Sequence, residues 1–192
     1  MLNWQNPEAA RTLLAIRKNA DMKKYHEKAF QAFVSQVSKS SWPDDQKLLM
    51  LDEAMNQAKT NAEKTSVIRA VGGLRSFLAL MFVSRYLDDK DLNRAASRSV
   101  MQIALPTADA RPGLTGAVVR STLQKILDKL EGQDSQYEVI DIQTYLANMP
   151  YTKGFEPIFN GEDLSGWQGL VENPIARAKM PKAELAKKQQ EA

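Results

Sequence analysis

Apolar residues between positions 64 and 105 recur every three or four residues, the spacing that lines up side chains on one face of an α-helix. A first helix carries Val67, Ile68 and Val71 on that face and ends near Gly72–Gly73. We expect the two glycines to supply the backbone freedom that a helix end requires. The pattern therefore predicts a packed helix followed by a tight turn.

Two more helices are predicted in the same block. Ser76 can cap the second helix, because a serine oxygen accepts a hydrogen bond from a free amide group in the first turn. Asp88–Asp89 then turn the chain, and alanines in the third helix would let it approach its neighbour closely. The apolar residues of these two helices are Phe77, Leu78, Met81, Phe82, Leu87, Leu92, Ala95, Ala96, Val100, Ile103 and Ala104.

Capping signals and apolar periodicity predict helices on both sides of this block. The start signals are Asn6–Pro7–Glu8, Asp21, Asp44–Asp45, Thr115 and the capping-box pair Ser135 and Glu138. The helices end near Asn19, Lys39, Thr60, Gly132 and Met149. The second of them is expected to bury Met22, Tyr25, Ala29, Phe30, Phe33, Val34 and Val37, and the third carries Leu48, Leu49, Leu51, Met55 and Ala58.

The order of a short helix, a Gly-Gly turn, an apolar helix and an Ala-rich helix resembles HEAT-type repeats. Such helix pairs cannot bury their apolar faces alone, so they stack on one another. The sequence therefore predicts an all-α fold. We expect residues 1–150 to form a HEAT-like or armadillo-type right-handed superhelix, and residues 151–192 to form a largely irregular tail.

Composition narrows the possible functions only slightly. The 192 residues include 26 Lys and Arg against 23 Asp and Glu, and a net charge of +3 does not by itself require an anionic partner. The chain has no cysteine, which excludes disulfides and thiolate chemistry. Its longest apolar run, Phe77–Val83, is too short for a membrane span, and we expect none.

No group of residues in the sequence has the spacing of a catalytic or ligand-binding site. His26 is the only histidine, which argues against a zinc site and a catalytic relay. Asp89, Asp91 and Asn93 imitate half of a calcium loop, but the required glycine and distal glutamate are missing, so helix capping is preferred. We therefore assign no catalytic, cofactor-binding or metal-binding residue, and we expect no cofactor.

A series of arginines is the one feature that suggests binding, because stacked helices can align such residues to hold phosphate or carboxylate. The preferred interpretation is internal, with the arginines bonded to carboxylates such as Asp88 and Asp91. The alternative is an anion-binding or nucleic-acid-binding module, although a nucleic acid is not the partner we expect. The series is Arg69, Arg75, Arg85, Arg94, Arg98, Arg111 and Arg120.

After Pro150 the composition changes to a short aromatic stretch with turn signals, Gly154-Phe-Glu-Pro-Ile-Phe-Asn-Gly-Glu-Asp-Leu-Ser-Gly-Trp167. This stretch resembles the opening of the 3-keto-disaccharide hydrolase family, and residues 169–180 and 184–186 also resemble members that carry a helical region before that domain. The matching residues are Phe155, Phe159, Asn160, Asp163 and Trp167, for which we expect a structural role in an entry strand and turn.

The resemblance implies that residues 151–192 hold a linker and the start of a hydrolase domain with a concanavalin-like β-sandwich fold, most of which lies beyond this chain. Without that domain the chain is expected to be non-catalytic. Met1–Trp4 shows no signal-peptide pattern, so either the protein is cytosolic or the chain is a piece of a longer one. The resemblance favours the second interpretation and implies an exported parent protein.

The expected function is that of a helical scaffold in a larger carbohydrate-active protein. Its expected partners are the neighbouring hydrolase domain and a protein bound on the concave face of the helices. Carbohydrate would be bound only through the domain that lies beyond this chain. The residues from 155 onward are expected to be either mobile or laid back over the helices.

Overall fold

The computed structural model describes residues 7–107, 111–130, 135–150 and 171–191. The chain divides into two units, Met1–Glu156 and Pro157–Ala192, which are described separately. The described residues form helices and connecting turns, and none of them forms a β-strand. This part of the chain is therefore all-α, as the sequence predicts.

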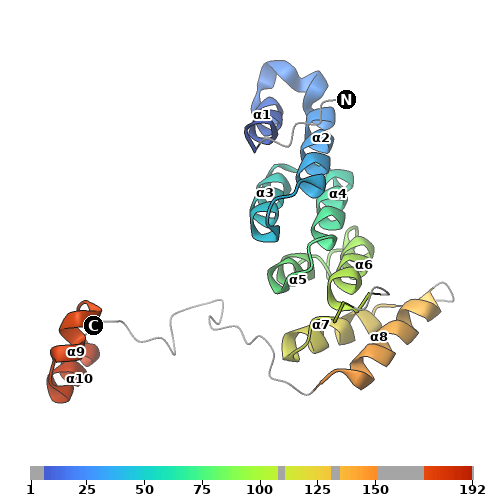
Figure 1. Ribbon diagram of the computed structural model, residues 1–192. Helices are drawn as coiled ribbons and strands as arrows, with labels where there is room; N and C mark the ends of the chain where they lie inside the picture. Colours follow the sequence, from blue (N-terminus) through green and yellow to red (C-terminus); the bar gives the residue numbers. More distant parts are fainter. Residues whose placement is uncertain (1–6, 108–110, 131–134, 151–170, 192) are drawn as a thin grey trace. The chain divides into compact units, whose positions relative to one another are not determined.

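The first unit, called the helical unit below, consists of helices packed in consecutive pairs (Figure 1). Helix α1 packs against α2, α3 against α4, α5 against α6, and α7 against α8. Successive pairs are joined because α4 also packs against both α2 and α6. The elements are α1 (Pro7–Lys18), the 3₁₀-helix η1 (Ala20–Tyr25), α2 (His26–Lys39), α3 (Asp44–Gln57), α4 (Asn61–Gly72), α5 (Phe77–Ser84), α6 (Asn93–Ala104), α7 (Ala117–Leu127) and α8 (Gln136–Asn148).

One continuous apolar core runs through the helical unit, from Ala10 on α1 to Met149 after α8. The periodic residues Val67, Ile68 and Val71 are completely buried in it, as expected. Burying the faces of neighbouring pairs against one another removes apolar surface from water, which is the main stabilising contribution in such stacks. The largest buried side chains are Phe30, Phe33, Leu51, Ile68, Leu80, Leu87, Leu92, Ile103, Leu123, Ile126 and Ile142.

Several apolar side chains assigned to packed faces lie instead at the surface. Met22 is 40% exposed and Tyr25 is 50% exposed, because the chain there forms η1 instead of the first turn of α2. Leu49 is 73% exposed, and Leu78 is 61% exposed. The prediction that Met22 and Tyr25 are buried is therefore wrong. Leu49 is an apolar side chain that the helical unit leaves exposed to solvent.

Some predicted helix starts are confirmed and others are wrong. Helix α1 begins at Pro7, and α3 begins at Asp44 with both predicted acids in its first turn. Ser76 caps α5, its side chain accepting a hydrogen bond from the Ala79 amide over 3.1 Å. Ser135 makes no capping hydrogen bond, and Gly116, with φ of 119°, caps α7 one residue after the predicted Thr115. Asp21 does not cap α2 but donates its own amide to the side chain of Asn19. The start of a helix thus depends on neighbours as well as on a suitable side chain.

Gly72 is required for a different reason from the one expected, and Gly73 is not constrained by its neighbours. Gly73 has an ordinary helical φ of −76°, so no unusual backbone conformation occurs at the end of α4. A Cβ added to Gly72 would lie 2.8 Å from Ser99 Oγ and 2.9 Å from Ser99 Cβ on α6. The missing side chain of Gly72 therefore allows α4 and α6 to approach closely.

The second unit contains two short helices among its described residues, α9 (Pro174–Lys179) and α10 (Lys182–Glu191). Asn173 caps α9 by accepting a hydrogen bond from the Ala176 amide over 2.9 Å. Lys188 on α10 forms a salt bridge of 3.1 Å with Glu172. The hydrolase-like stretch 154–167, with the predicted entry strand, lies outside the described residues.

Candidate functional site

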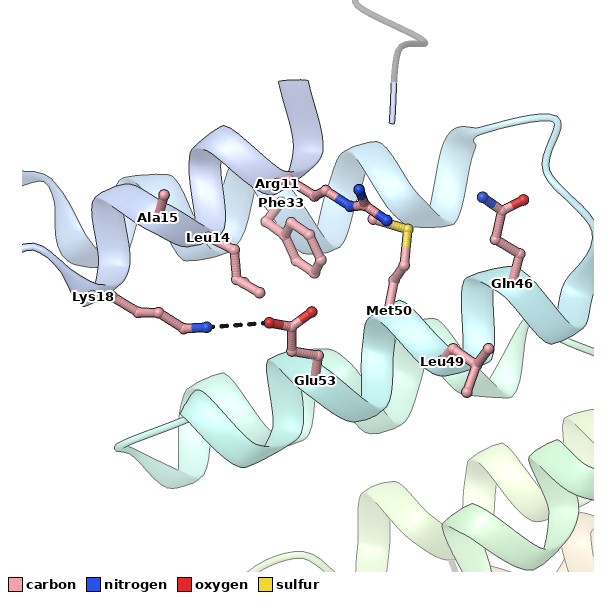
Figure 2. A pocket seen from close by; sticks show the side chains of 9 residues that line it. All are labelled: Arg11, Leu14, Ala15, Lys18, Phe33, Gln46, Leu49, Met50 and Glu53. Atoms are coloured by element: carbon pink, nitrogen blue, oxygen red, sulfur yellow. Dashed lines mark hydrogen bonds and ion pairs between the residues drawn. The ribbon is translucent and has the colours of Figure 1, made fainter. Parts of the chain in front are cut away.

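A groove between α1 and α3 is the candidate site, and we call it the α1/α3 groove. Residues at helical spacing line each wall, so one face of each helix borders the same space. Helix α2 closes the bottom with Phe33 (Figure 2). The groove has a volume of about 460 Å³. The wall residues are Arg11, Leu14, Ala15 and Lys18 on α1 and Gln46, Leu49, Met50 and Glu53 on α3.

The bottom of the groove is apolar and well packed. Leu14 and Phe33 are 4% and 1% exposed and belong to the core, and Met50 packs against the core from a half-buried position. Leu49 lies on the α3 wall and is mostly exposed. A segment lying in the groove would therefore find its apolar contact mainly at Leu49 and Met50 on the α3 wall.

The two ends of the groove differ in charge. At one end Lys18 Nζ lies 3.3 Å from Glu53 Oε1, and this exposed salt bridge spans the two walls (Figure 2). Arg11 lies two helical turns before Lys18, and among the described residues it has no carboxylate partner. The groove thus offers one compensated charge pair and one uncompensated cation beside an apolar surface.

A buried salt bridge fixes α1 in the position that opens the groove. Arg17 Nη2 donates to Glu63 Oε2 over 2.6 Å, and both side chains are almost completely buried. The guanidinium also stacks over the Phe30 ring at 5.2 Å. Glu63 itself completes a capping box with Thr60 at the start of α4. The sequence analysis predicted neither the Arg17–Glu63 salt bridge nor the capping box, although Thr60 and Glu63 have the spacing of a capping box.

Two members of the arginine series bind the ends of neighbouring helices. Arg75, just before α5, donates to the carbonyl oxygen of Leu105 at the end of α6 over 2.6 Å. Arg120 on α7 donates to the carbonyl oxygens of Leu146 and Met149 at the end of α8. The last carbonyls of a helix have no partner within it, so a guanidinium satisfies them well. These two arginines have an internal role, as expected, but they bind backbone carbonyls instead of the predicted carboxylates.

The remaining arginines are dispersed, and the carboxylates expected as their partners are used differently. Asp88 is bound by two lysines, and Asp91 accepts a hydrogen bond from Asn61 over 2.7 Å, so the predicted arginine pairing is wrong there. Arg85 stacks over Phe82 at 5.8 Å, and Arg98 lies 3.6 Å from Glu138. The exposed members are Arg69, Arg85, Arg94, Arg98 and Arg111.

Other residues considered for chemistry have structural contacts. His26 Nε2 lies 2.8 Å from the carbonyl oxygen of Asn19, and Asp89 Oδ1 accepts hydrogen bonds from the amides of Asp91 and Leu92. No group of three potential metal ligands occurs among the described residues. Within the same residues, no helix has both the length and the apolar character needed to cross a membrane.

No family model, curated protein or solved structure matches the chain. The resemblances to HEAT repeats and to 3-keto-disaccharide hydrolases therefore stay predictions.

Proposed function

We propose that the helical unit is a HEAT-like, non-catalytic binding module that holds a segment of a partner protein in the α1/α3 groove. The supporting observation is a groove between α1 and α3 that has Leu14 and Phe33 at its bottom and half-buried Met50 and exposed Leu49 on its α3 wall. Apolar grooves between paired helices commonly bind an amphipathic helix.

The groove favours an occupant of defined chemistry. Exposed Leu49 and half-buried Met50 offer apolar contact on the α3 wall, which suits the apolar face of a helix. Arg11 has no carboxylate partner among the described residues, so a Glu or Asp of the occupant would pair with it. The proposed occupant is therefore a short amphipathic helix with an acidic residue beside its apolar face.

Selection from a library of helical peptides displayed on phage tests this proposal directly. We expect enriched peptides to share apolar residues at helical spacing and a nearby carboxylate. Leu49→Glu should abolish their binding, and Arg11→Gln should weaken it. Leu78→Glu is the matched control, because Leu78 is a 61% exposed leucine on α5 outside the groove. Equal losses in the Leu49 and Leu78 variants would contradict the proposal.

We further propose that the module belongs to a larger carbohydrate-active protein. The support is the resemblance of residues 154–167 to the opening of 3-keto-disaccharide hydrolases. The test is hydrolysis of a 3-keto-disaccharide by the full parent chain, with and without residues 1–150. A change in activity or substrate size preference on deletion would support an accessory role. The absence of a β-sandwich domain after Ala192 in the parent would overturn the proposal.

A further inference from the structure

A second concave site, separate from the α1/α3 groove, lies where the ends of α2, α3 and α4 meet. It encloses about 400 Å³ and carries three cations, Lys39, Lys47 and Arg69, and we call it the basic hollow. No residue that lines it carries a carboxylate. The rest of its lining consists of Val34, Ser35, Ser38, Ser66, Ala70, Gly73 and Leu74.

The three cations are available to an external ligand. Among the described residues, none of them forms a salt bridge or a side-chain hydrogen bond. Arg69 and Lys39 are exposed, and Lys47 is half-buried. Like charges gathered at one concave surface repel one another, and a bound anion would relieve that repulsion.

Comparison with another helix pair shows why Lys47 is free. Lys47 and Arg120 are each the fourth residue of the first helix in their pair. Arg120 donates to the carbonyls that end α8, whereas Lys47 makes no such bond to the end of α4. The end of α4 is closed by its own backbone, with the Leu74 amide donating to the Val71 carbonyl over 2.8 Å.

Favourable interaction with helix dipoles explains only part of this cluster. Lys39 and Arg69 lie in the last turns of α2 and α4, where a cation is favoured. Lys47 lies near the start of α3, where the positive end of the helix dipole disfavours a cation. The convergence of all three on one hollow therefore requires another explanation.

We propose that the basic hollow binds a small phosphate-type anion with two or more negative charges. A guanidinium and two ammonium groups supply charge-assisted hydrogen bonds to its oxygens, with the Ser35 hydroxyl as a further donor. The hydroxyls of Ser38 and Ser66 donate within their own helices, to the Val34 and Glu63 carbonyls over 2.7 Å. Their protons are therefore already used and are not assigned to the anion. Inorganic pyrophosphate is the simplest probe for this chemistry.

Titration of the full chain with pyrophosphate, followed by amide NMR and calorimetry, tests the proposal. We expect saturable binding of one equivalent, shift changes centred on Ser35, Ser66 and Gly73, and weaker binding as salt is added. Lys47→Gln and Arg69→Gln should each weaken binding about tenfold, because a hydrogen bond to a charged group is lost. Circular dichroism confirms folding of the variants.

Arg85→Gln is the matched control, because it removes one exposed positive charge outside the hollow. Its affinity for pyrophosphate should equal that of the unmodified chain. No saturable binding, or an equal loss with Arg85→Gln, would overturn the proposal. A short single-stranded oligonucleotide forms the second arm of the test. If the oligonucleotide binds and its affinity falls equally in Arg69→Gln and Arg94→Gln, the chain has a diffuse basic surface. That result would also overturn the proposal.

Discussion

The Arg17 guanidinium on α1 and the Glu63 carboxylate on α4 meet 2.6 Å apart inside the helical unit, although 46 positions separate them in the chain. Glu63 Oε2 also accepts hydrogen bonds from the Lys59 and Thr60 amides, over 2.7 and 3.3 Å. The same carboxylate therefore begins α4 and holds α1 in place. The position of one wall of the α1/α3 groove depends on this contact.

Replacing Arg17 by Met should destabilise the helical unit strongly. The change leaves Glu63 buried without its cation, and breaking a buried ion pair in this way costs about 3–5 kcal/mol. Urea denaturation followed by circular dichroism measures the effect. Lys18→Met is the control, because Lys18 and Glu53 are more than half exposed and such pairs contribute about 0–1 kcal/mol. Similar losses in both variants would contradict the assigned role of Arg17.

Replacing Gly72 by Ala should also destabilise the unit, because the added methyl group would force α4 away from Ser99 on α6. Overpacking of this kind costs about 1–3 kcal/mol. Ser99→Gly removes the opposing atoms, so the double variant should recover part of the loss. Gly73→Ala is the neighbouring control, since its nearest obstacle is the Ala70 carbonyl at 3.4 Å and it should leave stability almost unchanged. Thermal unfolding compares the unmodified chain with Gly72→Ala, Ser99→Gly, the double variant and Gly73→Ala.

Asp88 should titrate at a lower pH than an ordinary aspartate. Hydrogen bonds from Lys125 and Lys129, the latter 2.9 Å long, lower the pKa of its carboxyl group. Because the folded-state pKa lies below the unfolded one, this stabilisation is present above the ordinary pKa and is lost as the pH falls through the lowered value. NMR titration of the side-chain carboxyl carbon measures the pKa of Asp88. In the double variant Lys125→Met, Lys129→Met, the pKa should return towards its ordinary value, and an unchanged pKa would refute the assignment.

Tyr145 should contribute to stability at neutral pH and lose that contribution in alkali. Its hydroxyl donates to the Leu114 carbonyl over 2.7 Å, and burial raises the pKa of the phenol. A raised folded-state pKa gives a stabilisation that is complete below the ordinary value, about 10, and disappears as the pH rises through the raised one. Tyr145→Phe should cost about 1 kcal/mol at neutral pH through the lost hydrogen bond.

The measurement for Tyr145 is stability against pH, from denaturant unfolding of both proteins. The difference between the unmodified chain and Tyr145→Phe should shrink above the raised pKa. Tyr86, whose pKa burial also raises, is present in both proteins and so cancels from the comparison. A difference that stays constant into alkali would contradict the prediction.

The sequence alone determined the helices and much of the core. Apolar periodicity is a local property of the chain, so it predicted the burial of Val67, Ile68 and Val71, and local capping chemistry predicted the role of Ser76. Apolar periodicity could not separate buried from exposed positions on an apolar helix such as α5, where Leu80 is buried and Leu78 is exposed. Every face of such a helix looks equally suited to packing.

Only the tertiary structure decided which residues meet across helices. The pairing of Arg17 with Glu63, the space that Ser99 requires at Gly72, and the convergence of Lys47 with Arg69 all join residues from different helices. The α1/α3 groove likewise depends on how far two separate helices are held apart. Periodicity fixes which side of one helix faces inward, whereas these contacts depend on how neighbouring pairs stack, and no short stretch of sequence encodes that.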